Sequence, residues 1–139
     1  MNILVIDAQG GGIGRQLVAK LIERIPEADI VAAGTNSMAT NAMIKAGAKK
    51  AATGENAIRY CASQAEIITG PIGILVANAM LGEISPAIAE SVGSSTAPKV
   101  LIPTAHCNTI IAGTKALPVK DSIEDAVDRI VRIHGGEDN

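Results

Sequence analysis

The chain of 139 residues contains no phenylalanine and no tryptophan, and Tyr60 is its only tyrosine. A surface that stacks nucleic-acid bases requires several aromatic side chains. The 12 lysines and arginines are scattered and are outnumbered by 14 aspartates and glutamates, whereas a nucleic-acid-binding face requires clustered positive charge. The composition therefore excludes a nucleic-acid partner. It also predicts a core of aliphatic side chains, as found between helices and a parallel sheet.

Three further absences limit where the chain acts and what it binds. No apolar run approaches the ~18 residues of a membrane-spanning helix, and the first residues lack the basic region and the small-residue cleavage site of a signal peptide. The two cysteines, Cys61 and Cys107, are too few and wrongly spaced for a zinc site. We therefore expect a cytoplasmic protein with reduced thiols, no membrane segment and no bound metal.

Aliphatic segments alternate with segments of helical periodicity along the whole chain. Apolar residues recur at helical spacing up to Ile25, and again over residues 120–133, where Ser122 and Asp125 form a capping pair. The alternation predicts a single-domain, three-layer α/β fold, with a mostly parallel sheet between two layers of helices. We expect this domain to span residues 1–134, followed by a flexible C-terminal tail at 135–139. The expected strands are 2–6, 28–34, 49–54, 66–70, 99–103 and 108–113, and the expected helices are 13–25, one ending near residue 47, 55–65, the second half of 71–93, and 120–133.

A glycine-rich loop, with four glycines between residues 10 and 14, separates the first strand from the first helix. Such a turn presents free N–H groups and the positive end of the helix dipole, which together bind phosphate. The dinucleotide fingerprint G-x-G-x-x-G requires glycines at positions 9, 11 and 14, and Gln9 replaces the first of them. We expect a nucleotide or dinucleotide phosphate to bind at loop 9–14. The ligand is expected to lie over residues 7–14, and the residues predicted to contact it there are Asp7, Gln9, Gly10, Gly11, Gly12, Ile13 and Gly14, with the phosphate on the last four amides.

Polar residues also follow the next two strands, and ligands of open α/β sheets bind beyond the carboxyl ends of the strands. Thr35 and Asn36 can hydrogen-bond a ribose, but the acidic residue typical of NAD sites is missing at this position. Thr53 and Asn56 are expected to flank the ligand. The cofactor predicted from this pattern is NAD or NADP, or another nucleotide.

Two other phosphate-binding motifs fit less well. A P-loop has Lys and Ser or Thr where this chain has Arg15 and Gln16, which argues against ATP hydrolysis by that route. A methyltransferase-type loop requires glycines at positions 9, 11 and 13, of which only Gly11 is present.

Asp7 precedes the glycine-rich loop, where a carboxylate repels phosphate unless a proton or a cation intervenes. Two interpretations stay open: Asp7 accepts hydrogen bonds from the loop amides and holds the turn, or it is a metal ligand or general base. The first is favoured, because no second carboxylate is placed to complete a metal site. His106 and Cys107 are adjacent, but neighbours on an extended chain point to opposite sides, so we assign no catalytic residue.

The segment 72–81, IGILVANAML, is apolar apart from Asn78. A segment that is apolar on all sides is either buried inside the domain or part of a subunit interface. In so short a chain we expect an interface, and thus a homodimer or higher homo-oligomer that assembles through residues 71–90.

Four stretches of the chain resemble a family of short bacterial Rossmann-like proteins catalogued as a domain of unknown function: VIDAQGGGIG, GTNSMATNAMIKAGA, ATGENAI and GPIGILVANAMLGEISPAIAESVGSS. The resemblance extends from about Asn2 to about Ile133. It implies a stand-alone bacterial domain with a Rossmann-like fold, and it implies no activity, substrate or catalytic residue.

Three functions are compatible with these features. The chain is an enzyme that uses NAD(P) or another nucleotide, a non-catalytic metabolite sensor, or a homo-oligomeric interaction module in which the glycine-rich loop is only a structural turn. The enzyme and the sensor each require a small-molecule ligand, and the ligand of the enzyme contains phosphate. Because the polar loops contain few acid–base residues, an enzyme would need a partner or a neighbouring subunit to complete its site.

Overall fold

The computed structural model describes residues 1–104 and 108–137. Strands and α-helices alternate along most of the chain, and a short 3-10 helix, η1, follows β4. In the described residues the strands are β1 (Asn2–Asp7), β2 (Asp29–Gly34), β3 (Lys50–Thr53), β4 (Ile67–Pro71) and β5 (Lys99–Ile102). The helices are α1 (Gly12–Arg24), α2 (Ser37–Lys45), α3 (Glu55–Gln64), η1 (Ile72–Leu75), α4 (Pro86–Ser94) and α5 (Val119–His134).

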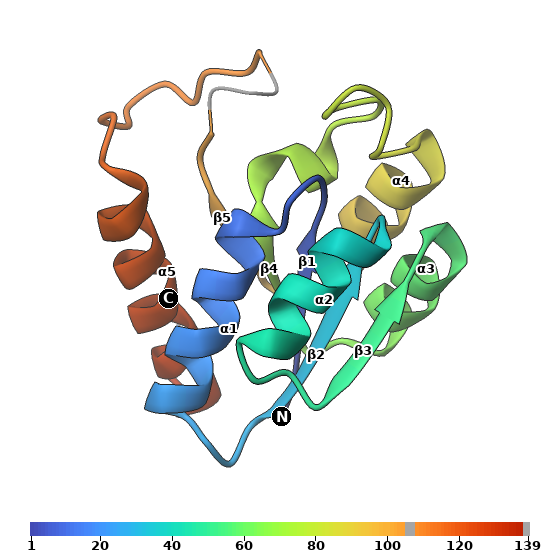
Figure 1. Ribbon diagram of the computed structural model, residues 1–139. Coiled ribbons are helices and arrows are strands. Elements are labelled where there is room, and N and C mark those ends of the chain that lie inside the picture. Colours follow the sequence, from blue (N-terminus) through green and yellow to red (C-terminus); the bar gives the residue numbers. More distant parts are fainter. Residues whose placement is uncertain (105–107, 138–139) are drawn as a thin grey trace.

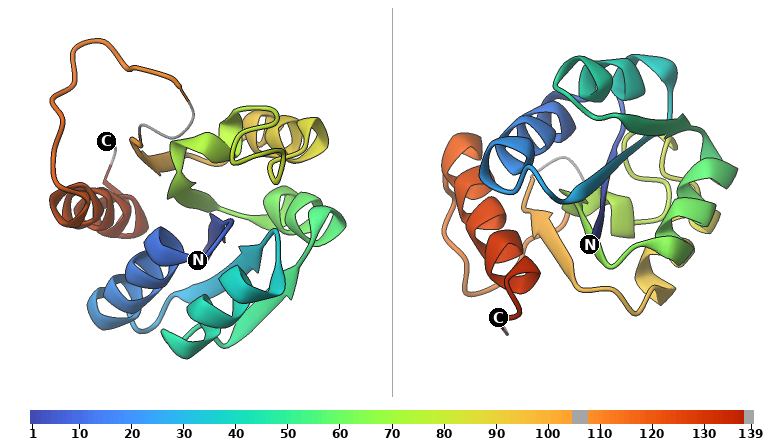
Figure 2. Two further views of the ribbon diagram at one scale, coloured as in Figure 1. Left: turned by 45° about the horizontal axis from the view of Figure 1, so that its top comes forward. Right: turned by 90° about the horizontal axis from the view of Figure 1, so that it is seen from below.

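The strands form one parallel sheet in the order β3-β2-β1-β4-β5. Helices α1, α2 and α5 cover one face of the sheet, and α3, α4 and η1 cover the other (Figures 1 and 2). These layers confirm the predicted single-domain α/β fold. The chain builds β2 and β3 on one side of β1 and then crosses to β4 and β5 on the other, so the loops after β1 and β4 diverge at a switch point.

Alternate residues of β1 contribute to a separate hydrophobic core on each face of the sheet. Ile3 and Val5 pack in the core that contains α1 and α5, and Leu4 and Ile6 pack in the core that contains α3 and α4. All four side chains are fully buried. Burial of each such side chain stabilises the folded state by about 1.5–3 kcal/mol. The two cores hold β1 at the centre of the sheet and so fix the position of the glycine-rich loop that follows it.

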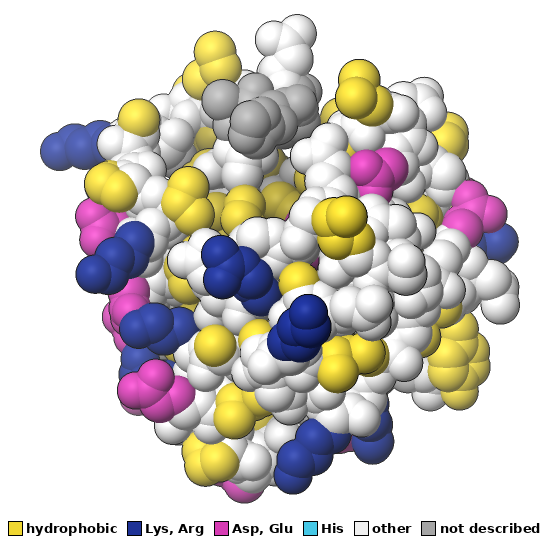
Figure 3. All heavy atoms as spheres, in the orientation of Figure 1, with side chains coloured by type: hydrophobic (Ala, Val, Ile, Leu, Met, Phe, Trp, Pro, Cys, Tyr) yellow, Lys and Arg dark blue, Asp and Glu magenta, His cyan; other side chains and the backbone are white. Residues whose placement is uncertain are grey.

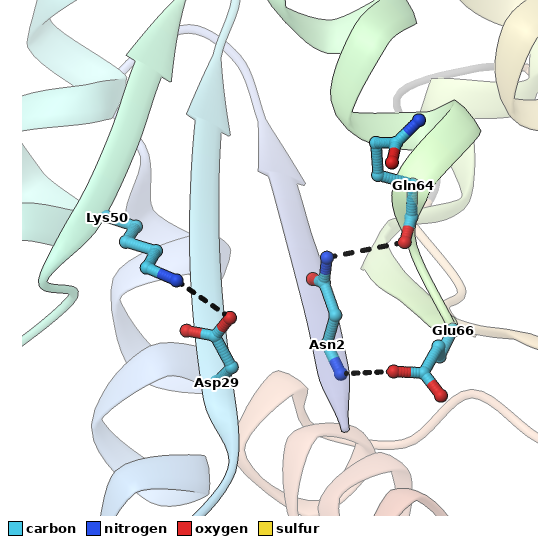
Figure 4. A network of polar contacts seen from close by, with 5 residues as sticks. All are labelled: Asn2, Asp29, Lys50, Gln64 and Glu66. Carbon is cyan, nitrogen blue, oxygen red and sulfur yellow. Dashed lines mark hydrogen bonds and ion pairs between the residues drawn. The ribbon is translucent and has the colours of Figure 1, made fainter.

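Polar contacts at the amino ends of the strands join segments that are distant in sequence (Figure 4). The backbone N–H of Asn2 donates to Oε1 of Glu66 at 2.9 Å, and the Asn2 side chain donates to the Gln64 carbonyl at 3.3 Å. Lys50 forms an ion pair with Asp29 at 3.0 Å. These groups align the first four strands at the end of the sheet opposite the glycine-rich loop.

The predicted sixth strand at residues 108–113 is wrong. This segment forms turns and irregular backbone, and Ile110 is 95% exposed. Its two isoleucines are typical of a strand, but Asn108 and Gly113 on either side have positive φ values of 52° and 84°. A strand also needs a neighbour for its backbone groups, and within the described residues β5 pairs with β4 alone.

The predicted capping pair of the last helix is also wrong. Helix α5 begins at Val119, one turn earlier, directly after Pro118. Ser122 is buried inside the helix, and Asp125 forms an ion pair with Arg129 at 3.0 Å. The proline, whose ring fixes φ, sets the start of the helix in place of a side-chain cap.

The apolar segment 71–93 is divided between core and surface. Its second half is helical, as predicted, and forms α4. Its first half is not a continuous helix, because η1 is followed by turns in which Met80 and Leu81 have positive φ. Ile74 and Ile84 are fully buried within the chain, whereas Leu81 is 100% exposed.

Candidate functional site

A pocket of about 340 Å³ opens at the carboxyl edge of the sheet, where the strand order changes direction between β1 and β4. Ligands of open α/β sheets bind at this position, and small-molecule pockets typically have volumes of about 300–1,000 Å³. Most of the lining comes from the end of β1 and the glycine-rich loop. The residues that line the pocket are Asp7, Ala8, Gln9, Gly10, Gly11, Gly12, Ile13, Gln16, Pro71, Met80, Thr104 and Val119.

The glycine-rich loop presents two unused backbone donors to this pocket. Gly11 adopts φ 72° at the N-cap of α1, and its N–H donates to the Ala8 carbonyl at 3.0 Å. The N–H groups of Gly10 and Gly12, in contrast, have no acceptor among the described residues. A Cβ added at either of these two glycines would have no heavy atom within 4 Å. Both glycines therefore offer open backbone to a ligand.

Asp7 holds the glycine-rich loop against the start of α1. Its Oδ1 accepts from Ala8 N–H at 2.8 Å, and its Oδ2 accepts from Gly14 N–H at 2.7 Å. These are the hydrogen bonds that the structural interpretation of Asp7 predicts. A Cβ added at Gly14 would lie 2.7 Å from Met43 Sδ and 2.8 Å from Asp7 Cβ. Gly14 therefore has the packing role of the third fingerprint glycine, and its amide is not available to a phosphate.

Burial raises the pKa of Asp7 above its ordinary value of 3.8, because the side chain is removed from water and the residue is only 4% exposed. Hydrogen bonds from the amides of Gly14, Ala8 and Ile13 lower the pKa but do not cancel the effect of burial, and the charge of Glu83 raises it further. The carboxylate already occupies the positive end of α1. A phosphate on the same loop must therefore bind on the side of Gly10 and Gly12.

Glu83, in the loop between η1 and α4, reaches across to the ends of β1 and β2. Its Oε1 accepts hydrogen bonds from Gln9 N–H at 2.9 Å, Thr35 Oγ1 at 2.7 Å and Asn36 Nδ2 at 2.8 Å. Asn36 also donates to the Gln9 carbonyl at 3.1 Å, and its Oδ1 caps α2 by accepting from Ala39 N–H at 2.9 Å. The structure thus brings together three of the predicted residues, but it joins them through a carboxylate of the chain itself.

No motif in the sequence identifies Glu83. No acidic residue directly follows β2, and the structure supplies one from 48 residues beyond Thr35. Burial would raise the pKa of Glu83, but the hydrogen bonds from Thr35, Gln9 and Asn36 outweigh it and hold the pKa below its ordinary value of 4.5. This carboxylate lies beside Thr35 and Asn36 at the carboxyl end of β2, which is the strand end that carries the acidic residue of a dinucleotide site.

Thr53 and Asn56 lie apart from the pocket. Thr53 Oγ1 donates to Thr40 Oγ1 at 2.8 Å at the end of β3, and Asn56 is exposed in the first turn of α3. Thr53 pairs with Gly34 of β2, and Thr40 Oγ1 in turn donates to the Asn36 carbonyl at 3.1 Å, so Thr53 lies near Thr35 and Asn36. Neither Thr53 nor Asn56 lines the pocket.

Two further predictions concern cysteine and metal chemistry. His106 and Cys107 lie outside the described residues. Cys61 is half-buried, and burial raises the pKa of its thiol. Within residues 1–104 and 108–137, no three His, Cys, Asp or Glu side chains are grouped so that they could hold a metal ion. In the same part of the chain, no helix has the length and hydrophobicity needed to cross a lipid bilayer.

The chain belongs to the family described as a domain of unknown function, DUF3842, whose model matches residues 2–135. The match confirms the resemblance that the four sequence stretches indicate. No curated protein is significantly similar to the chain.

Two solved structures are similar to this chain at low sequence identity. The crystal structure of a dodecameric FMN-dependent Ubix-like decarboxylase from Escherichia coli O157:H7 is 16% identical, with a TM-score of 0.52 over 100% of this chain and 96% of that chain. The crystal structure of AibC is 14% identical, with a TM-score of 0.46 over 97% of this chain and 39% of that chain. At this identity, the likeness to the decarboxylase shows a shared fold.

Proposed function

We propose that this member of the DUF3842 family binds a nucleotide whose phosphate lies on the N–H groups of Gly10 and Gly12. The observation that carries the proposal is the pocket of about 340 Å³ over these two glycines. Neither glycine has a positive φ, and neither is in close contact with another residue, so the fold does not require glycine at either position. The lack of a side chain there instead leaves the backbone open to an anion.

The geometry favours a mononucleotide over a dinucleotide. In NAD sites the adenosine ribose donates hydrogen bonds to an acidic residue at the end of β2. Here Glu83 already accepts hydrogen bonds from Thr35 and Asn36 at that position. NAD or NADP would have to displace these contacts, whereas a mononucleotide that extends toward Pro71 and Val119 leaves them intact.

FMN is the first mononucleotide to test, because the Escherichia coli decarboxylase with the same fold is FMN-dependent. Pro71, Met80 and Val119 give the pocket an apolar side that suits a flat ring. Asp7 is the one titratable group among the described lining residues. Its buried carboxyl holds the loop, so any chemistry at this site would come from the bound group or from a partner.

The test is a dye-based thermal-shift titration with FMN, riboflavin, AMP, NAD and NADPH, since the chain has no tryptophan to report binding. A ligand at about 100 times its Kd stabilises the folded state by about 2.7 kcal/mol. For a domain of this size such a change raises the Tm by several degrees. FMN is expected to raise the Tm, and riboflavin, which lacks the phosphate, is expected to leave it unchanged.

Gly12→Val is the decisive variant, because it places a side chain in the proposed phosphate position, and a Cβ added there has no heavy atom within 4 Å. It is expected to abolish the FMN shift and to keep the Tm of the free protein. Gly93→Val in α4 is the matched control, since a Cβ there has only an ordinary contact of 3.9 Å with Leu75. If no nucleotide raises the Tm of the parent protein, or if Gly12→Val unfolds it, the glycine-rich loop is a structural turn and the proposal is wrong.

We also propose that the chain forms a homo-oligomer through residues 71–90. Leu81 is completely exposed next to Met80, which is only partly buried. Exposed apolar groups of this kind mark interfaces when they cluster. The Escherichia coli decarboxylase with the same fold is dodecameric, which supports assembly but does not identify the surface.

A further inference from the structure

A second hollow, of about 810 Å³, lies between the outer surfaces of α1 and α2 and is called here the α1–α2 groove. Small side chains form part of its lining: Ala19 on α1, and Ala42 and Ala46 on α2 or just after it. Figure 3, which looks onto this face of the molecule, shows Lys and Arg side chains over both helices. The other lining residues are Gly10, Arg15, Gln16, Ser37, Met38, Asn41 and Lys45.

The α1–α2 groove has a positive charge that the protein does not neutralise. Arg15 and Lys45 line it, no acidic residue does, and neither cation forms an ion pair with a described residue. The other cations of α1, Lys20 and Arg24, pair with acidic residues of α5 at 2.6 and 2.8 Å. Arg15 is also near the positive end of α1, where the helix dipole makes a cation unfavourable. The stability of the helix therefore does not explain its position.

The α1–α2 groove borders the pocket of about 340 Å³ over Gly10 and Gly12. Gly10 and Gln16 line both hollows, and Nε2 of Gln16 donates to the Gly12 carbonyl at 2.9 Å. A phosphate chain that begins on the Gly10 amide can extend past Gln16 toward Arg15. Ser37 and Asn41 supply further polar groups from the α2 side of the groove.

We propose that the α1–α2 groove binds the second phosphate of a nucleoside diphosphate whose first phosphate lies on Gly10 and Gly12. The inference rests on the proposed function and narrows the ligand to a nucleotide with a diphosphate group. The guanidinium of Arg15 matches a phosphate with two parallel N–H donors, and Lys45 adds a compact positive charge. The nucleoside occupies the pocket of about 340 Å³ on the other side of Gly10.

The test uses inorganic phosphate and pyrophosphate as probes, because they report on the two anion positions without any contribution from a base. Each is titrated into 15N-labelled protein in the presence of EDTA, and amide shifts are followed by NMR. Both probes are expected to shift the Gly10 and Gly12 amides, and pyrophosphate alone is expected to shift those of Ser37 and Asn41. Pyrophosphate is expected to bind about tenfold more tightly than phosphate.

Arg15→Gln and Lys45→Gln are each expected to weaken pyrophosphate binding by about tenfold and to change phosphate binding by less than about twofold. Lys49→Gln is the matched control, since Lys49 is an exposed cation outside the groove. It is expected to change neither affinity by more than about twofold, because exposed distant charges are screened.

Two unfavourable results can be distinguished. If phosphate shifts Gly10 and Gly12 but pyrophosphate binds no more tightly, or binds Arg15→Gln as well as the parent protein, the inference about the groove is wrong and the proposed phosphate site stands. If neither probe shifts Gly10 and Gly12, the inference about the groove is wrong, and if FMN also fails to shift them, the proposed function is wrong as well.

Discussion

Oε1 of Glu83 lies 2.8 Å from Nδ2 of Asn36, although 47 residues separate them in the chain. The same oxygen accepts hydrogen bonds from Thr35 and from the N–H of Gln9. One carboxylate therefore joins the loop after η1 to the loops after β1 and β2. The segment 78–82 that leads to Glu83 contains three non-glycine residues with positive φ, a conformation that costs about 1–2 kcal/mol per residue for most side chains. The hydrogen bonds to Glu83 help to hold this segment in place.

Glu83→Gln is expected to lower the free energy of unfolding by about 1–2 kcal/mol, because hydrogen bonds to a charged acceptor are stronger than those to a neutral amide. Chemical denaturation of both proteins at neutral pH measures the difference. Glu90→Gln, at an exposed position of α4, is the control and should have no effect. Equal stability of Glu83→Gln and the parent protein would show that the carboxylate does not hold the three loops together.

The same carboxylate gives stability a defined dependence on pH. The pKa of Glu83 is lower in the folded state than its ordinary value of 4.5, because the hydrogen bonds to its ionised form outweigh burial. Its contribution to stability is therefore present above pH 4.5 and is lost as the pH falls through the folded pKa. The difference in unfolding free energy between the parent protein and Glu83→Gln should shrink over this range. A constant difference from pH 7 to pH 3 would contradict the expected titration.

Asp7 should have the opposite effect on stability. Burial raises its pKa above 3.8, so the folded protein binds the proton more tightly than the unfolded chain does. Its contribution is therefore fully present below pH 3.8 and is lost as the pH rises through the folded pKa. A 13C NMR titration of the Asp7 carboxyl measures that pKa directly and needs no mutation. An apparent pKa at or below 3.8 would show that the amide hydrogen bonds, not burial, dominate.

Gln9 tests whether the missing fingerprint glycine matters. Gln9 has φ 51°, a left-handed conformation that glycine adopts without strain. Gln9→Gly removes this strain but increases the conformational entropy of the unfolded chain. These two effects oppose each other, so the free energy of unfolding should stay within about 1 kcal/mol of the parent value. Gln9→Val should lower it by about 1–2 kcal/mol, because a β-branched residue is strained at positive φ. Gln64→Val, in an exposed helical position, is the control, and an equal effect at both positions would show that φ at Gln9 is not the cause.

Leu81 tests the proposed interface. It is 100% exposed, so Leu81→Ser should change the stability of the monomer by less than about 0.5 kcal/mol. If residues 71–90 form the interface, the substitution should shift the protein toward monomer in sedimentation velocity. Ile110→Ser, at a 95% exposed position outside that segment, is the control. If the parent protein, Leu81→Ser and Ile110→Ser have the same distribution of oligomers, any interface lies outside residues 71–90.

The sequence predicts the fold class well because its signals are local. The aliphatic segments and the periodic segments between them determine a layered sheet with helices on both faces, and the glycines after β1 indicate a turn into a helix. The predicted sixth strand has the same kind of local signal in Ile110 and Ile111, but nothing local shows whether a neighbouring strand can pair with it. The strand order depends on such long-range pairing and is visible only in the structure.

The site is less predictable because its key contact depends on the path of a loop. Glu83 follows Met80 and Leu81, whose left-handed backbone has no sequence signature, since such positions usually contain Gly, Asn or Asp. Gln9 likewise adopts a backbone conformation that glycine would favour, and the residue type does not reveal this because it does not match the fingerprint. In both places the tertiary structure overrides local preference.

Gly14 and Gly12 lie two positions apart and should respond in opposite ways to alanine. A Cβ at Gly14 would lie 2.7 Å from Met43 Sδ and 2.8 Å from Asp7 Cβ, so α1 would have to move away from β1. Gly14→Ala is therefore expected to lower the free energy of unfolding by about 1–3 kcal/mol, the usual cost of overpacking.

Gly12→Ala meets open space, and alanine restricts the unfolded chain, so this variant should equal or exceed the parent in stability by up to about 1 kcal/mol. Denaturant titration of the three proteins measures both effects. If Gly12→Ala is as stable as predicted, any loss of phosphate binding by this variant reports on the ligand and not on folding. If both variants are equally destabilised, the loop requires glycine at each position for its own structure, and the argument for an open phosphate site at Gly12 fails.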